Sequence, residues 1–114
     1  MERFQDTLRK LAILDEQFAE AVFAPNLTGA SPLDPKIAAL VQVAASVAIG
    51  SSATCLQWSA ARALAAGATK DEIADVLVTL APVAGLGRVV SAAPEVATAL
   101  DYDIDAALEE FDGS

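Results

Sequence analysis

The spacing of apolar residues predicts a chain built from helices. Along residues 2–22, apolar side chains recur at helical intervals with charged residues between them, which predicts an amphipathic helix; the stripe consists of Phe4, Leu8, Leu11, Phe18 and Val22. Residues 24–33 are rich in Pro, Gly and Asn and are expected to form a loop. No stretch alternates apolar and polar residues with a period of two, so no β-strand is expected.

Helix start and stop signals divide the middle of the chain. Asp34 followed by Pro35 predicts a helix start, because a carboxylate caps the first turn and the missing proline N–H is not needed there. This helix is apolar nearly all round and is expected to be the central one. Gly67 predicts the end of the next helix, the third along the chain. Thr69 and Glu72 form a capping box that opens the fourth.

Prolines and acidic residues organise the end of the chain. Pro82 is expected to begin or kink a further helix, and a break before Pro94 is expected to precede a shorter helix that ends at Leu100. Residues 101–114 form an acidic tail with room for one more helical turn or two. The resulting prediction is an all-α bundle of about six helices, with residues 1–114 forming a single domain.

Composition changes this picture in two ways. Apolar residues make up 54% of the chain and aromatic residues only 5%, so a short chain carries much apolar surface, which predicts a homo-oligomer. Seven basic residues against sixteen acidic ones give a net charge of −9, which argues against nucleic acids and anionic membranes as partners. No signal-peptide pattern opens the chain, and the apolar run 37–49 is too short to span a bilayer, so the cytoplasm is the expected location.

Candidate chemistry gathers on one predicted helix face. Cys55, Trp58, Ser59 and Arg62 are spaced i, i+3, i+4 and i+7, which puts them on one stripe. A stripe that mixes a thiol, an indole, a hydroxyl and a cation is expected to line a pocket, which Arg88 is also expected to approach. Two arginines there would favour a ligand that carries a carboxylate.

Each of these residues also has a purely structural interpretation. Cys55 is either a reactive thiolate or a buried, inert apolar side chain. Trp58 either stacks on a planar ligand or fills the core or a subunit contact. Arg62 and Arg88 each need a carboxylate, supplied by a ligand or by a neighbouring Asp or Glu. With one cysteine and no histidine, neither a disulfide framework nor a metal site is expected, and no cofactor is predicted.

Segments in the middle of the chain resemble the carboxymuconolactone decarboxylase family, which includes the alkylhydroperoxidase D-like proteins. The resemblance is strongest over residues 33–93. The segments that carry it are Leu33-Asp34-Pro35-Lys36, residues 40–50, residues 61–69 (ARALAAGAT) followed by Glu72-Ile73, and residues 77–88 (LVTLAPVAGLGR). It implies an all-helical, alkylhydroperoxidase D-like bundle that assembles into trimers or hexamers. It also implies a site near the start of the helix that carries Cys55.

The chain departs from the catalytic pattern of that family. In the peroxidase branch, the resemblance places the second cysteine of Cys-x-x-Cys at Cys55, the first at Ser52 (or Ser51), and the histidine at Ser59. The family glutamate falls near Ala39 or Leu40. We therefore expect a cofactor-free protein that binds a small organic, carboxylate-bearing molecule through Ser52, Trp58, Ser59, Arg62 and Arg88, with any turnover being of the lyase or isomerase kind. The alternatives are a thiol peroxidase that uses Cys55 alone and a non-catalytic scaffold subunit.

Overall fold

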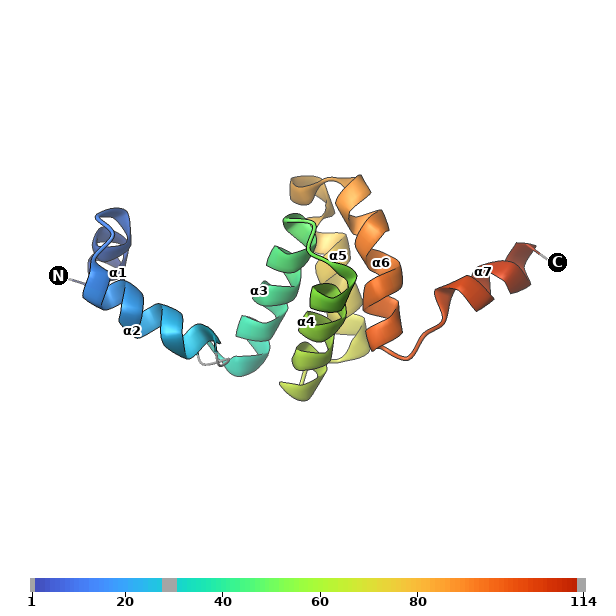
Figure 1. Ribbon diagram of the computed structural model, residues 1–114, viewed down its shortest axis with the longest axis horizontal. Coiled ribbons are helices and arrows are strands. Elements are labelled where there is room, and N and C mark those ends of the chain that lie inside the picture. Colours follow the sequence, from blue (N-terminus) through green and yellow to red (C-terminus); the bar gives the residue numbers. More distant parts are fainter. Residues whose placement is uncertain (1, 28–30, 113–114) are drawn as a thin grey trace. The chain divides into compact units, whose positions relative to one another are not determined.

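The computed structural model describes residues 2–27 and 31–112, with the side chains of residues 2–21 and 31–110. The chain divides into two compact units, residues 1–34 and residues 35–114. The expectation of a single domain over residues 1–114 stays a prediction. The described residues contain seven helices and no strand, so the prediction of an all-α fold is confirmed (Figure 1).

The first unit contains two helices where the sequence predicted one. α1 spans Arg3–Ala12 and α2 spans Glu16–Leu27, so the single helix over 2–22 is wrong. The chain breaks between them because Leu14 takes a positive φ of 56°, and the Asp15 carboxylate accepts a hydrogen bond from the Phe18 N–H at 2.9 Å. An aspartate in this position caps a new helix rather than continuing the old one. α2 also runs into the predicted loop 24–33, as far as Leu27.

Four helices of the second unit build its core. They are α3 (Pro35–Ala48), α4 (Ala53–Ala65), α5 (Lys70–Ala84) and α6 (Leu86–Ala99), and Figure 1 shows them running alternately up and down with short connections. α3 packs against α4, α5 and α6, as expected of a central helix. Small and branched side chains fill the space between the helices: Ala39, Val43, Val47, Leu56, Ala60, Ala63, Ala68, Ile73, Leu77, Ala92 and Val96.

The helix ends in this unit follow their local sequence signals. α3 begins at Pro35 as predicted. Gly67, with φ of +100°, follows the end of α4 in the left-handed region that favours glycine. The Thr69 hydroxyl accepts a hydrogen bond from the Glu72 N–H at 3.0 Å, and the Glu72 carboxylate accepts one from the Thr69 N–H at 2.9 Å. This is the predicted capping box, and it opens α5.

The two prolines do not break the helices. Pro82 lies inside α5 and Pro94 lies inside α6, so the predicted helix start at Pro82 and the predicted break before Pro94 are wrong, whereas a kink at Pro82 stays a prediction. A helix-interior proline leaves the carbonyl four residues earlier without its usual donor. Those earlier residues, Val78 and Val90, are 73% and 62% exposed, so neither proline interrupts a helix at a buried turn. The real boundary is Gly85, whose φ of +95° separates α5 from α6.

The acidic tail forms a further helix. α7 spans Ile104–Asp112, longer than the one or two turns predicted, and the Asp103 carboxylate accepts a hydrogen bond from the Ala106 N–H at 3.0 Å in its first turn. The described residues thus form seven helices instead of about six. The first predicted helix is split into α1 and α2, the predicted helices on either side of Pro94 are joined in α6, and the acidic tail adds α7. None of the described helices has the length and apolar character needed to cross a bilayer.

Candidate functional site

The start of α4 presents the cysteine to solvent. Ser52 is the N-cap residue, and its hydroxyl accepts a hydrogen bond from the Cys55 N–H at 3.3 Å. The Cys55 side chain is exposed, so its interpretation as a buried apolar side chain is wrong. Ser52 has a structural role as a helix cap, and its role in ligand binding stays a prediction.

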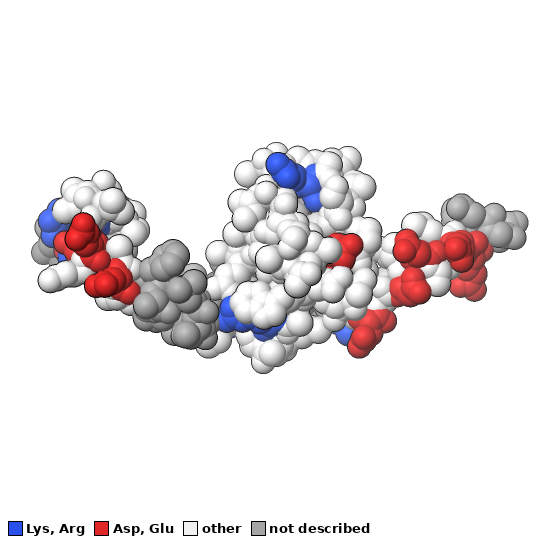
Figure 2. All heavy atoms as spheres, in the orientation of Figure 1, with Lys and Arg blue, Asp and Glu red and all other residues white. Residues whose placement is uncertain are grey.

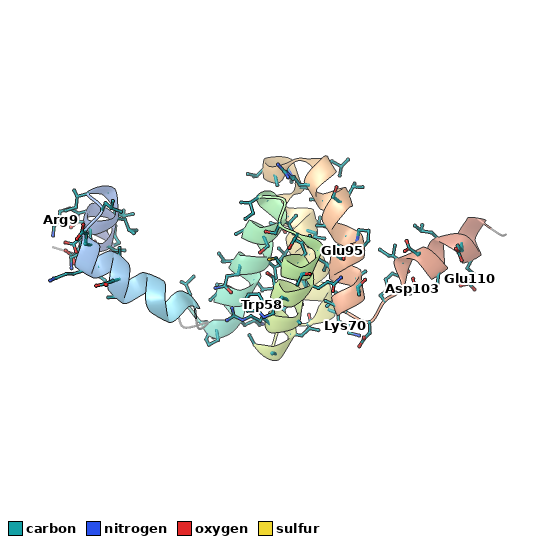
Figure 3. All side chains as sticks on the ribbon, in the orientation of Figure 1. Arg9, Trp58, Lys70, Glu95, Asp103 and Glu110 are labelled. Atoms are coloured by element: carbon teal, nitrogen blue, oxygen red, sulfur yellow. The ribbon has the colours of Figure 1, made fainter. Side chains whose placement is uncertain are left out.

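Trp58 and Arg62 lie next to each other on α4. The Arg62 guanidinium lies over the Trp58 ring at 4.7 Å from its centroid, within the range of a cation–π contact. Arg62 Nη1 also donates a hydrogen bond to Gln42 Oε1 on α3, at 3.4 Å. Trp58 remains 57% exposed, and Figure 3 labels it on α4. Among the described side chains, the partners of Arg62 are thus an indole and an amide instead of the expected acid.

Ser59 faces the interior between two helices. It is buried, and its hydroxyl lies 3.0 Å from that of Ser46 on α3, where either serine can donate the hydrogen bond. This pairing satisfies two polar groups at the α3–α4 contact. Ser59 therefore joins helices in this unit, and a contact with a ligand stays a prediction.

Arg88 lies at the other side of the α4 N-terminus, against the α3–α4 turn. Its guanidinium covers Gly50, where a side chain would overlap it, and Gly50 has a positive φ of 70°. A pocket of about 350 Å³ opens here, lined by Val47, Gly50, Ser51, Ala53, Leu56, Arg88, Ser91, Ala92 and Glu95. None of the described carboxylates lies within ion-pair distance of Arg88. At this end of the unit, Figure 2 shows basic atoms surrounded by uncharged ones.

A carboxylate occupies another part of the same pocket. Glu95 projects from α6 and its Oε2 accepts a hydrogen bond of 2.7 Å from Gln57 Nε2 on α4. Glu95 is only half-buried, and Figure 3 labels it on α6. Gln57 is a neutral donor, so it orients the carboxylate without neutralising its charge.

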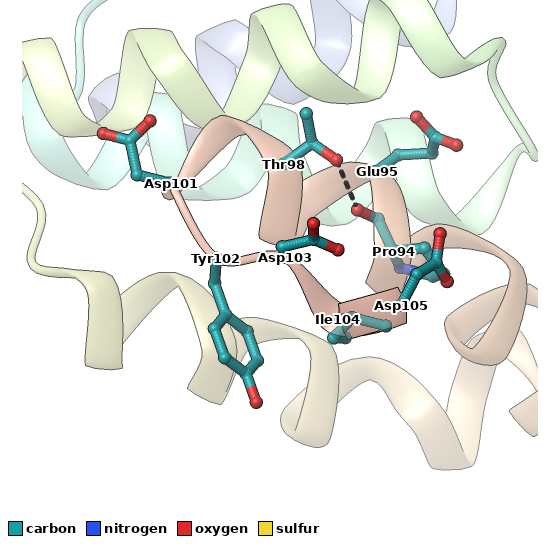
Figure 4. Close-up of a pocket in the computed structure, with 8 residues that line it drawn as sticks. All are labelled: Pro94, Glu95, Thr98, Asp101, Tyr102, Asp103, Ile104 and Asp105. Atoms are coloured by element: carbon teal, nitrogen blue, oxygen red, sulfur yellow. Dashed lines mark hydrogen bonds between the residues drawn. The ribbon is translucent and has the colours of Figure 1, made fainter. Parts of the chain in front are cut away.

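A second hollow opens where α6 leads into α7. It has a volume of about 490 Å³ and is lined by Pro94, Glu95, Thr98, Asp101, Tyr102, Asp103, Ile104 and Asp105 (Figure 4). In Figure 4 the Tyr102 ring points away from the carboxylates of Asp103 and Asp105. The described residues contain no group of three acidic, cysteine or histidine side chains that is placed to hold a metal ion.

Known proteins identify the family of this chain. The sequence model of the carboxymuconolactone decarboxylase family matches residues 10–99. The chain belongs to the carboxymuconolactone decarboxylase family. Comparisons with curated proteins and with solved structures return no match. The resemblance inferred from the sequence is confirmed by this match, which extends further toward the N-terminus than residues 33–93.

This member of the carboxymuconolactone decarboxylase family arranges the predicted residues in two groups. Trp58 and Arg62 contact each other on α4 and Cys55 is exposed near its start, whereas the lining of the Arg88 pocket includes neither these three residues nor Ser59. The expectation that all five side chains share one cavity therefore has no support in the described pockets. Their roles in binding or catalysis stay predictions.

Sequence reasoning missed the residues that surround Arg88. Arg88, Ser91 and Glu95 are spaced i, i+3 and i+7, which puts them on one face of α6. That spacing is visible in the sequence, but the expected break before Pro94 separated Glu95 from the other two residues. Gln57 carried no signal, because its role depends on the packing of α4 against α6.

Proposed function

We propose that this protein binds a small organic carboxylate in the Arg88 pocket. The observation that carries the proposal is the placement of the Arg88 guanidinium, which covers Gly50 in a pocket and has no ion-pair partner among the described side chains. A guanidinium presents paired N–H donors that match the two oxygens of a carboxylate.

The rest of the pocket supports a ligand of this kind. Its volume of about 350 Å³ is at the small end of the range for ligand sites. Val47, Leu56 and Ala92 provide apolar wall, and Ser51 and Ser91 provide hydroxyl groups. A small molecule with a hydrocarbon body and a carboxylate therefore matches the pocket in size and chemistry. We propose no cofactor, and any turnover would be acid–base chemistry of the lyase or isomerase kind.

The test compares Arg88 with Arg62, the other arginine of the second unit. A screen of small carboxylates by thermal melting shift identifies the ligand, and calorimetry then measures its affinity for the wild type, Arg88→Met and Arg62→Met. Loss of a charge-assisted hydrogen bond lowers affinity by roughly tenfold to a hundredfold. We expect this loss in Arg88→Met, with Arg62→Met close to the wild type. Equal loss in both variants, or loss in Arg62→Met alone, would contradict the proposal.

Exposure of Cys55 favours a second candidate, a one-cysteine thiol peroxidase. In that reaction the Cys55 sulfur takes the outer oxygen of a hydroperoxide, giving a sulfenic acid and an alcohol. Two molecules of an external thiol then reduce the sulfenic acid, giving water and a disulfide of the external thiol. A two-cysteine cycle is not expected, because Ser52 cannot act as the resolving thiol. Peroxide turnover that depends on an added thiol and disappears in Cys55→Ser would support this candidate.

We further propose that the protein is a homo-oligomer, a trimer or a hexamer. The supporting observation is an apolar groove of about 400 Å³ between α3 and α5, lined by Ile37, Leu40, Val41, Ala44, Glu72, Asp75, Val76, Thr79 and Leu80. Ile37 and Val41 are about half exposed there. Apolar surface of this kind is commonly covered by another protein surface, and a second copy of the chain is the proposed occupant. A non-catalytic scaffold remains the third candidate, and the cytoplasm remains the predicted location.

A further inference from the structure

We infer that the ligand of the Arg88 pocket is a zwitterion, a small amino acid whose amine lies at the opposite end from its carboxylate. This inference rests on the proposed function and extends it to the class of ligand. In this arrangement Arg88 binds the carboxylate and Glu95 binds the protonated amine.

The two charged residues of the pocket lie on one face of one helix. Arg88 and Glu95 are seven residues apart in α6, which is about two turns and about 10 Å along the helix axis. Both line the same pocket, with Ser91 between them on the same face. A ligand that lies along α6 thus meets a positive group at one end and a negative group at the other.

Neither charge is neutralised by the protein in the part of the chain that the structure describes. Arg88 and Glu95 form no ion pair with each other or with any other described side chain. Gln57 donates a hydrogen bond of 2.7 Å to one oxygen of Glu95, which fixes the carboxylate and leaves the other oxygen free to accept a hydrogen bond. An ammonium group has three donors and a positive charge, so it matches that oxygen.

The charge of the whole chain favours a zwitterion over a simple anion. With a net charge of −9, the protein repels an anionic ligand as it approaches. A ligand with one carboxylate and one ammonium group has no net charge and avoids this repulsion. It also offers an opposite charge to both Arg88 and Glu95, which form no ion pair among the described side chains.

The test uses ligands that differ only at the end opposite the carboxylate. Isothermal titration calorimetry compares δ-aminovalerate, δ-hydroxyvalerate and valerate, with γ-aminobutyrate and ε-aminocaproate covering shorter and longer chains. Wild-type protein should bind the best amino acid at least tenfold more tightly than the acid of equal length without an amine. Glu95→Gln should remove this preference and retain binding of the simple acid, whereas Arg88→Met should weaken both, with folding of each variant checked by circular dichroism.

The ligand comparison on wild-type protein separates failure of this inference from failure of the proposed function. If valerate and its homologues bind as tightly as the amino acids, the inference is wrong and the Arg88 carboxylate site stands. If the hydroxy acid binds as tightly as the amino acid, the amine is not required and the inference is also wrong. If no carboxylate binds at all, the proposed function itself is rejected.

Discussion

Gly50 is the residue that makes room for the proposed site. Its φ of +70° is in the region that favours glycine, and a Cβ there would overlap the Arg88 guanidinium. Gly67 has a similar need for a positive φ of +100°, but apart from its own atoms and those of its two chain neighbours, no atom lies within 4 Å of where its Cβ would be. Comparison of alanine substitutions at Gly50 and Gly67 therefore distinguishes the effect of backbone strain, which both share, from the effect of displacing Arg88, which only Gly50 has.

We expect Gly50→Ala to lower both stability and ligand affinity. The positive φ alone should lower the free energy of unfolding by about 1–2 kcal/mol in each of Gly50→Ala and Gly67→Ala. Only Gly50→Ala should also displace Arg88 and weaken carboxylate binding by tenfold or more. Urea denaturation measures the first effect and calorimetry the second. Unchanged affinity in Gly50→Ala would show that the position of Arg88 against Gly50 does not matter for binding.

Among the helices, the sequence predicted best where a helix end is fixed by adjacent residues. Pro35, Gly67 and the Thr69–Glu72 capping box all lie where expected, because each signal acts within one turn. Pro82 and Pro94 were misleading, since the effect of a proline depends on the surroundings of the carbonyl four residues earlier.

The candidate site was predicted only in part, for the same reason. Arg88 was identified because a cation in an apolar stretch is conspicuous in any sequence. The hydrogen bond between Gln57 and Glu95 joins α4 to α6 across 38 positions of the chain, and no local pattern encodes it. The burial of Ser59 against Ser46 is likewise a product of helix packing.

The capping box of α5 predicts a dependence of stability on pH. The hydrogen bond from the Thr69 N–H, and then the contact with Lys36 at 3.0 Å, hold the pKa of Glu72 below its ordinary value of 4.5. A lowered pKa in the folded state means that Glu72 stabilises the fold above about pH 4.5 and loses this effect as the pH falls through the lowered pKa. Glu72→Gln should therefore melt below the wild type at neutral pH, with a difference that shrinks in acid.

Thermal unfolding followed by circular dichroism between pH 7 and pH 3 measures this difference. Asp71→Asn is the matched control, because it removes a carboxylate from the same first turn that makes no ion pair among the described residues. A gap between wild type and Glu72→Gln that stays constant, or widens in acid, would contradict the assigned role of Glu72.

At the scale of the whole molecule, the apolar groove between α3 and α5 predicts self-association. Val41 lines this groove and is 53% exposed, so Val41→Glu would place a charge inside the proposed interface. Ala61→Glu adds the same charge at an exposed position of α4 outside the groove. Light scattering after size exclusion should give the wild type and Ala61→Glu a mass several times 11.7 kDa, and Val41→Glu a lower mass. A wild-type mass near 11.7 kDa at micromolar concentration would reject the oligomer.

Binding of a carboxylate beside Arg88 can be observed residue by residue in a nuclear magnetic resonance titration. Amide signals of ¹⁵N-labelled protein are followed while δ-aminovalerate or valerate is added. We expect saturable shifts that centre on Gly50, Ser51, Arg88 and Ser91, which line the pocket. Shifts that centre on Trp58 and Arg62 instead, or no saturable shifts with either ligand, would contradict it.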